Sequence, residues 1–189
     1  MTSKLFAVAA VAAVAMAGAA TGIEGQAQRQ AAGGQVTASA EIKGKGITGT
    51  AQLTERAQGT GTIVEISIQA NGLTPGKHGV HLHAVGKCEP DFAAAGGHFD
   101  PGPASNTDPD ANHPFHMGDV PNLEVGADGR GSMKILTSRV TLSDGPLSVF
   151  DADGTAIIIH GNEDQMKTGA PKSGVSGGPR AACGVLTKK

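Results

Sequence analysis

Short segments that alternate apolar and polar residues dominate the 189-residue chain, and glycine-rich turns separate them. Such alternation is typical of half-buried β-strands, and turns such as Ala127-Asp128-Gly129 mark the strand ends. The predicted strands are residues 36–43, 47–57, 62–73, 77–85, 123–126, 131–136, 140–142, 156–160 and 181–186. Many short strands at near-regular spacing, without a convincing long amphipathic helix, predict an all-β sandwich or barrel.

Two stretches interrupt this pattern. Residues 89–121 and 163–178 are long, are rich in turn-forming residues and have little strand character. Loops of this length are uncommon unless they are functional or disordered. Because both adjoin histidines, we interpret them as functional loops held by metal and by a disulfide.

The first residues are typical of a secretory signal peptide. A positively charged start precedes an apolar run that is too short to cross a bilayer comfortably, and two A-x-A cleavage sites end at Ala17 and Ala19. An uncleaved membrane anchor is the alternative. We expect a signal peptide over residues 1–19, a flexible leader over 20–34 and one folded domain over 35–189.

Composition excludes some classes of function. The chain has no tryptophan, no tyrosine and five phenylalanines, so its core must consist of valine, isoleucine, leucine and alanine. The formal net charge is −2, and no basic run or aromatic platform accompanies the lysines. These features argue against nucleic-acid binding. Once the signal peptide is removed, no stable membrane association is expected.

Cys88 and Cys183 are the two cysteines of the chain. In an exported protein, an isolated pair indicates one disulfide. The bond would close a loop of about 95 residues, for which the chain-entropy model gives roughly 4–5 kcal/mol of stabilisation. Metal ligation by the thiolates is the weaker alternative, because neither cysteine lies in a C-x-x-C pattern.

The histidines carry the chemistry. Six of the seven lie between residues 78 and 116, and neutral imidazole is the commonest protein ligand for transition metals. His81 and His83 lie two apart on a predicted strand, so they share a face and can chelate one ion. His78 has the opposite parity, and we expect it to brace the site through hydrogen bonds. His116 and Asp119 are spaced to suit zinc, while His160 ends a distant apolar strand and could enter the same site.

Several motifs together resemble the copper/zinc superoxide dismutases, particularly the exported bacterial branch. The matching segments are GKHGVHLH (76–83), Cys88, GGHFDP (96–101), HMGD (116–119), FDADGTAIIIH (150–160) and GPRAACGV (178–185). The resemblance extends from Val36 to the C-terminus. It implies a Greek-key β-sandwich or flattened barrel of about eight antiparallel strands with two long functional loops.

The resemblance also implies a copper site and a zinc site. The copper ligands would be His81, His83, His98 and His160. His98 matches the bridging imidazole that links the two metals and carries a proton for the product. The zinc ligands would be His98, His116, Asp119 and one more histidine.

The fourth zinc ligand departs from the family pattern. Its usual place, midway between the bridge and the HMGD motif, holds Asn106, Thr107 and Asp108. We assign the role to His113, the remaining histidine. The alternative makes His113 a solvent-facing loop residue, with Asp108, Asp110 or water as the ligand.

Outside the ligands, Asp164 matches a carboxylate that connects a copper histidine with a zinc histidine and so fixes their orientation. Arg180 matches the active-site arginine, which holds a small anion beside the copper. Lys167 and Lys172 are candidates for steering superoxide, although each could equally be a solubilising surface charge.

The implied function is dismutation of superoxide to dioxygen and hydrogen peroxide by an exported enzyme, periplasmic or secreted, with copper and zinc as cofactors. The alternative is an exported copper- or zinc-binding protein of the same fold without dismutase turnover. The resemblance allows a homodimer, and no exposed apolar stretch in the sequence decides the oligomeric state.

Overall fold

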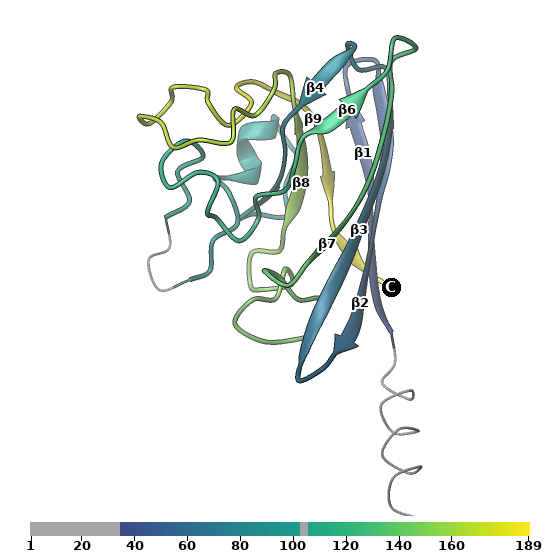
Figure 1. Ribbon diagram of the computed structural model, residues 1–189, viewed down its shortest axis with the longest axis vertical. Coiled ribbons are helices and arrows are strands. Elements are labelled where there is room, and N and C mark those ends of the chain that lie inside the picture. Colours follow the sequence, from purple (N-terminus) through teal and green to yellow (C-terminus); the bar gives the residue numbers. More distant parts are fainter. Residues whose placement is uncertain (1–34, 103–105) are drawn as a thin grey trace, which may run out of the picture. The chain divides into compact units, whose positions relative to one another are not determined.

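The computed structural model describes residues 35–102 and 106–189, and it shows an all-β domain (Figure 1). The expected signal peptide and leader, residues 1–19 and 20–34, lie outside the described residues. Nothing in the described part forms a helix long and apolar enough to cross a membrane.

Ten strands and one short 3-10 helix make up the regular structure of the described residues. They are β1 (Val36–Gly44), β2 (Ile47–Gln58), β3 (Gly61–Asn71), β4 (Gly76–His78), β5 (Val80–His83), η1 (Phe92–Ala95), β6 (Leu123–Val125), β7 (Arg130–Thr137), β8 (Ala156–His160), β9 (Arg180–Val185) and β10 (Thr187–Lys188). The hydrogen-bonded order is β4-β6-β7-β3-β2-β1-β9-β8-β5, with β10 beside β1. All of these pairings are antiparallel, which confirms the predicted all-β class.

The sheet curls into a nearly closed barrel. β4 and β5 lie at opposite ends of the strand order, although a single residue, Gly79, separates them in the chain. The amide of Gly79 donates to the carbonyl of Asn162 at 2.9 Å, and its own carbonyl accepts from the amide of His160 at 2.8 Å. The first and last strands of the sheet, β4 and β5, therefore meet at Gly79.

The core follows from the alternation in the long strands. In β3, Val64, Ile66 and Ile68 are buried at every second position, and they pack with apolar residues of the neighbouring strands. β8 departs from alternation because both of its faces are covered. Ile157 and Ile159 join the main core, whereas Ile158 packs on Cys183 and Ala95 on the other side.

The strand predicted over residues 77–85 is divided in the structure into β4 and β5, and β5 ends at His83. Gly79 lies between the two strands, and neighbours approach its backbone closely. A Cβ at this position would lie 3.1 Å from the carbonyl oxygen of Ser176 and 3.2 Å from Cβ of Asp164. The alternation pattern did not reveal this interruption, which lies where segments distant in the sequence pack against Gly79.

The predicted strand over residues 140–142 is wrong. Val140 and Leu142 are buried as expected, but Thr141 forms an isolated bridge with Ser148 and the segment joins no strand. The amide of Leu142 donates to the carboxylate of Glu55 instead of to a neighbouring strand. The burial of Val140 and Leu142 was predicted correctly, but the hydrogen-bond partner of the Leu142 amide was not.

The two long loops, residues 84–122 and 161–179, contact each other beside β5 and β8. Thr168 donates its hydroxyl to the carbonyl of His113 at 2.7 Å, and Gly169 donates its amide to the carbonyl of Asp110 at 2.8 Å. The segments that sequence analysis interpreted as functional loops are thus assembled at one side of the barrel (Figure 1).

Candidate metal centre

β5 supplies the first two side chains of the centre. His81 and His83 are completely buried, and their ring centroids lie 6.4 Å apart. The outer edge of β5 is lined by loop backbone in place of another strand. The amide of Leu82 donates to Gly118 at 2.9 Å, and its carbonyl accepts from Phe99 at 2.8 Å. These bonds fix the places of the neighbouring residues His98 and Asp119.

Glycines allow this close packing. A Cβ on Gly97 would lie 1.8 Å from the carbonyl oxygen of Thr107, and one on Gly118 would lie 2.5 Å from that of Leu82. No side chain fits in either place. Gly118, which precedes Asp119, therefore lets the loop approach β5, and Gly97, which precedes His98, lets two parts of the loop approach each other.

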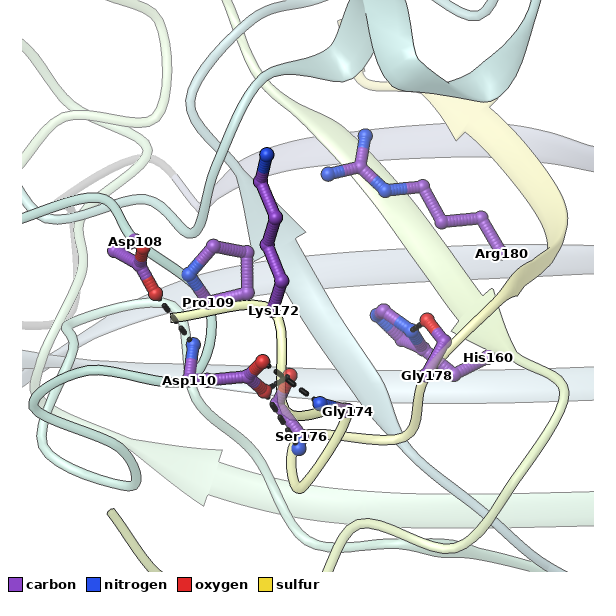
Figure 2. Close-up of a pocket in the computed structure, with 9 residues that line it drawn as sticks. All are labelled: Asp108, Pro109, Asp110, His160, Lys172, Gly174, Ser176, Gly178 and Arg180. Atoms are coloured by element: carbon purple, nitrogen blue, oxygen red, sulfur yellow. Dashed lines mark hydrogen bonds between the residues drawn. The ribbon is translucent and has the colours of Figure 1, made fainter. Parts of the chain in front are cut away.

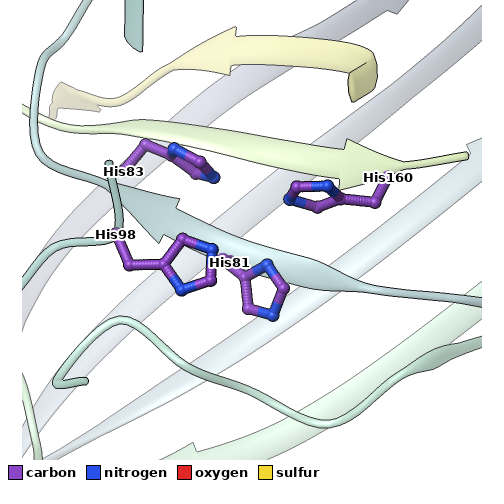
Figure 3. A group of neighbouring side chains, drawn as sticks. All are labelled: His81, His83, His98 and His160. Atoms are coloured by element: carbon purple, nitrogen blue, oxygen red, sulfur yellow. The ribbon is translucent and has the colours of Figure 1, made fainter. Parts of the chain in front are cut away.

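Four histidines converge beside the end of β8. Ligand atoms of His81, His83, His98 and His160 all lie within 4.8 Å of one another (Figure 3). One nitrogen of each ring already has a partner. His83 and His160 each place Nδ1 3.0 Å from a carbonyl oxygen, of Gly96 and Gly178 respectively.

The other two rings of this group contact carboxylates. Nε2 of His81 lies 3.0 Å from Oδ2 of Asp164, and Nδ1 of His98 lies 2.7 Å from Oδ1 of Asp119. Because carbonyl and carboxylate oxygens only accept, the contacting nitrogen of each ring carries the proton in the neutral tautomer.

The remaining nitrogens of this group lack partners. Among the described residues, Nδ1 of His81 and Nε2 of His83, His98 and His160 are buried without a hydrogen-bond partner. Burial lowers the pKa of these histidines, well below the usual 6.5 for His81 and His83 and to about 4 for His160. Four buried lone pairs in one place suit a transition metal that prefers imidazole.

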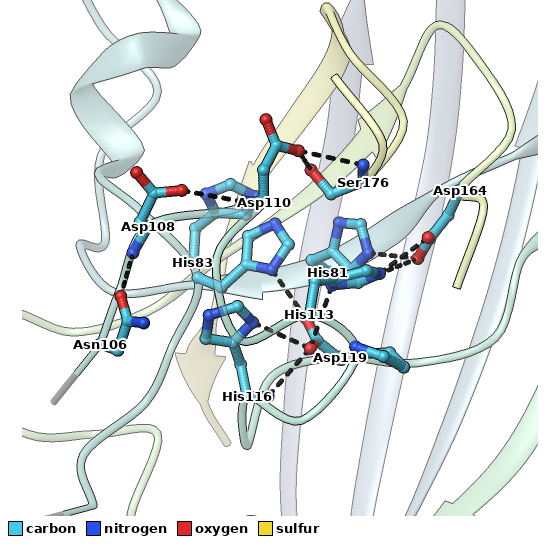
Figure 4. A network of polar contacts seen from close by, with 12 residues as sticks. His81, His83, Asn106, Asp108, Asp110, His113, His116, Asp119, Asp164 and Ser176 are labelled. Atoms are coloured by element: carbon cyan, nitrogen blue, oxygen red, sulfur yellow. Dashed lines mark hydrogen bonds and ion pairs between the residues drawn. The ribbon is translucent and has the colours of Figure 1, made fainter. Parts of the chain in front are cut away.

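A second group surrounds Asp119. Nδ1 of His98, His116 and His113 lies 2.7, 2.9 and 3.2 Å from its carboxylate oxygens (Figure 4). Tetrahedral zinc with bonds of about 2.0–2.1 Å separates its ligand atoms by roughly 3.3 Å, so these three nitrogens lie slightly closer to the carboxylate than they would around such an ion. The four residues whose ligand atoms all lie within 4.8 Å of one another here include His81 instead of His116. We favour His116 because Asp164 occupies Nε2 of His81 and Nδ1 of His81 belongs to the first group.

His113 is completely buried, so the solvent-facing alternative does not fit its position. Burial by itself would lower its pKa, but contacts with Asp119 and Asp164 outweigh burial and raise the pKa to about 9. The same contacts hold the pKa of both carboxyl groups below the usual range, against the effect of burial. In the metal-free protein the three residues therefore form a charged cluster.

Asp164 connects the two groups. Its carboxylate lies 3.0 Å from Nε2 of His81 and 2.7 Å from Nε2 of His113. The side chain of Asn122 both donates to and accepts from the backbone of Asp164, with each distance 2.9 Å. The structure thus places Asp164 where sequence analysis expected it, and Asn122 is a contact that the sequence did not indicate.

His78 lies outside both groups. Its Nδ1 lies 2.7 Å from the carbonyl oxygen of His160, and its Nε2 lies 2.8 Å from that of Thr74. The side chain connects β4 with the end of β8. This position agrees with the expected brace.

Arg180 borders a pocket of 340 Å³ at the surface of the first group. Its guanidinium donates to the carbonyls of Phe92, at 2.5 Å, and Gly96. Burial lowers the pKa of Arg180, but a guanidinium stays charged at neutral pH. The pocket is lined by Asp108, Pro109, Asp110, His160, Lys172, Gly174, Ser176, Gly178 and Arg180 (Figure 2). Lys167 does not line it.

A disulfide joins Cys88 to Cys183, so thiolate ligation of a metal does not apply. The bond attaches the segment that leads into η1 to strand β9. Gly96, which follows η1, offers its carbonyl oxygen to both His83 and Arg180. The disulfide therefore supports the part of the loop that orients these two side chains.

Fold and site together define an antiparallel β-barrel with two adjoining groups of buried side chains that could hold metal ions. The sequence matches a family model described as copper/zinc superoxide dismutase over residues 47–186. A superoxide dismutase [Cu-Zn] of Deinococcus radiodurans is 40% identical over 167 residues, which cover 81% of this chain and 85% of that protein. One of Caulobacter vibrioides is 38% identical over 146 residues, covering 73% and 77%. The chain belongs to the copper/zinc superoxide dismutase family, which confirms the resemblance.

Relatives from Bacillus subtilis carry a different description. The superoxide dismutase-like protein YojM is 42% identical over 128 residues, covering 65% of this chain and 62% of that protein. A crystal structure of a SOD-like protein from this organism has a TM-score of 0.63 at 33% identity, covering 79% of this chain and 97% of that one. A double mutant of a SOD-like protein, in which a tyrosine and a proline are replaced by histidines, has a TM-score of 0.59 at 35% identity, covering 78% and 95%.

Proposed function

We propose that this protein dismutes superoxide, with copper at His81, His83, His98 and His160. The observation that carries the proposal is the set of four orphaned nitrogens beside a pocket that contains Arg180. We assign zinc to His98, His113, His116 and Asp119. Both identities rest on family membership and on the fit of the ligands.

His98 is the residue that belongs to both groups. Its Nε2 faces the copper group and its Nδ1 faces Asp119, which suits a bridging imidazole. When bound, copper supplies the redox chemistry: one superoxide gives up an electron and leaves as dioxygen, and a second accepts it and leaves as hydrogen peroxide after gaining two protons. When Nε2 of His98 is not bound to copper, it would carry one of these protons beside the reduced oxygen.

Arg180 holds the substrate. Superoxide offers only its charge and two oxygen atoms for recognition, and the carbonyls of Phe92 and Gly96 fix the guanidinium at the pocket. Its charge supplies the attraction to an anion that a protein of net charge −2 lacks on average. Arg180 would therefore bind the anion, while the histidines orient the metal.

Export completes the proposal. We propose that residues 1–19 direct export, that 20–34 form a leader, and that 35–189 act in a periplasm or outside the cell. The disulfide and the bacterial relatives named superoxide dismutase support this location. The rate of secretion of a variant without residues 1–19 tests it.

The second candidate is a copper- and zinc-binding protein without turnover. The relative named superoxide dismutase-like gives this candidate its support. Arg180 favours the enzyme, because a metal buffer needs no cation at the pocket beside the copper group.

The deciding experiment measures dismutation by the purified protein loaded with copper and zinc. We expect activity in the wild type and a loss of at least about 100-fold in His160→Ala, since one of four copper ligands is missing. Arg180→Gln should retain both metals and lose activity. Metal binding without activity in the wild type would favour the buffer, and undiminished activity in His160→Ala would remove the copper assignment.

A further inference from the structure

The carboxylate of Asp110 connects the two long loops. The side chain is 4% exposed. Its Oδ2 accepts the amide of Gly174 at 2.8 Å, and its Oδ1 accepts both the amide and the hydroxyl of Ser176, at 3.1 and 2.8 Å (Figures 2 and 4). The carbonyl of Asp110 accepts from Gly169 at 2.8 Å. One residue of the first loop thus contacts several residues of the second.

The chemistry of these contacts requires a carboxylate. A buried anion is costly unless donors surround it. The donors here include the amides of Gly174 and Ser176 and the hydroxyls of Ser176 and Ser173. Their hydrogen bonds outweigh burial and hold the pKa of Asp110 below its usual value. An asparagine of the same shape would turn an NH₂ group toward one of these donors, where it cannot accept.

Ser176 lies directly beside the centre. It forms an isolated β-bridge with Asp164, the carboxylate that contacts His81. The two following residues contact His160: a Cβ on Gly177 would lie 2.7 Å from Cβ of His160, and the carbonyl of Gly178 lies 3.0 Å from its Nδ1. A displacement of Ser176 would therefore move the groups that orient His160.

We propose that Asp110 is a positioning residue of the centre: by holding Ser176 it fixes the Gly178 carbonyl that orients His160. The predicted effect on the rate rests on the proposed dismutase function. The predicted effect on the loop contacts does not. Nothing in the reaction requires Asp110 to touch the substrate.

Charge and position predict opposite effects at this residue. Asp110 lines the pocket together with Arg180, so its negative charge opposes the approach of an anion. If it acted only as a charge, Asp110→Asn would speed the reaction with superoxide. If it positions Ser176, the same substitution slows the reaction and loosens the loop.

The test uses the full chain loaded with copper and zinc. In Asp110→Asn we expect the amides of Gly174 and Ser176 to exchange hydrogen about tenfold faster, because a hydrogen-bonded charged group is lost. The Cu(II) electron paramagnetic resonance spectrum should change with the orientation of His160, and kcat/KM should fall about threefold to tenfold.

Asp108→Asn is the matched control. Asp108 lines the same pocket, and its Oδ1 accepts the amides of Asp110 and Ala111 at 3.0 Å, which an asparagine oxygen can still do. We expect wild-type exchange and spectrum, and a rate that does not fall. Ser176→Ala keeps the charge of Asp110 and removes one donor, so it should accelerate exchange at Gly174 by a smaller factor.

Wild-type exchange and spectrum in folded Asp110→Asn, or a rate that does not fall below that of wild type, would overturn the proposal. If Asp110→Asn does not fold, the Ser176→Ala variant provides the test. Hydrogen exchange at the Gly174 amide that equals that of wild type in this variant would then contradict the positioning role. A wild type without dismutase activity would refute the proposed function alone, because exchange and the copper spectrum need no turnover.

Discussion

Both carboxylate oxygens of Asp164 lie within hydrogen-bonding distance of Nε2 of His113, at 2.7 and 2.8 Å. When the ring of His113 is neutral, as in a metal ligand, an N–H donated from Nε2 to this carboxylate leaves the lone pair on Nδ1, which is turned toward Asp119. His113 therefore has the orientation that a zinc ligand needs, although its place in the sequence departs from the family pattern.

Replacing His113 with alanine should weaken zinc binding by at least about tenfold and leave copper bound, because the four orphaned nitrogens of the copper group remain. Elemental analysis after dialysis against a chelator measures both metals. Phe115→Ala is a suitable control, since this side chain lies two residues away and is 63% exposed. Equal zinc in all three proteins would contradict the assignment of His113.

Lys172 should contribute to capture of superoxide. It lines the pocket with Arg180, whereas Lys167 does not. At low ionic strength Lys172→Gln should lower kcat/KM about twofold to threefold, and salt should remove the difference by screening. Pulse radiolysis at several salt concentrations measures this, with Lys167→Gln as the control. If both variants lose the same activity, the pocket position of Lys172 has no special role.

Glu55 should stabilise the fold in a pH-dependent manner. Burial raises its pKa, but hydrogen bonds from Ser143 and Leu142 lower it below the usual 4.5. A group with a lowered pKa stabilises the folded state above about pH 4.5, and this stabilisation is lost as the pH falls through the folded-state pKa.

Glu55→Gln should therefore destabilise the metal-free protein by about 1–3 kcal/mol at pH 7, and the difference from wild type should shrink in acid. Urea denaturation across this pH range gives both values. Glu41→Gln, at an exposed ion pair with Lys43, should have little effect. A deficit that stays constant with pH would show that ionisation of Glu55 is not its source.

Removing the disulfide should affect both stability and substrate capture. The Cys88→Ser, Cys183→Ser double variant should lose about 2–5 kcal/mol of unfolding free energy. Its kcat/KM should also fall, because the loop that presents Gly96 to Arg180 is no longer attached to β9. Thermal unfolding with and without a reductant provides the comparison. A reductant that lowers the Tm of the variant as much as that of the wild type would point to another cause.

Much of the fold was predictable because alternation reports which face of a strand is buried. The long strands β1, β2 and β3 begin and end within two residues of their predicted bounds. The failures lie where backbone partners come from distant segments. Gly79, between β4 and β5, packs against Ser176 and Asp164, and Leu142 donates its amide to Glu55.

In the site, too, some residues were predictable from the sequence and others depend on contacts between distant segments. Its histidines were predictable because the residue type itself carries the chemistry, and His81 and His83 share a strand. Asp110 was considered only as a substitute ligand, since the chain holds many ordinary aspartates and its partner Ser176 lies 66 residues away. Asn122 was missed for the same reason.

The outer edge of β5 is paired with loop backbone, through Leu82, Phe99 and Gly118, where a further strand would otherwise bind. An uncovered strand edge invites pairing with another molecule. The residues that cover this edge adjoin the proposed metal ligands His98 and Asp119. The loop backbone thus takes up hydrogen-bonding groups of β5 that a strand of a second molecule could otherwise use.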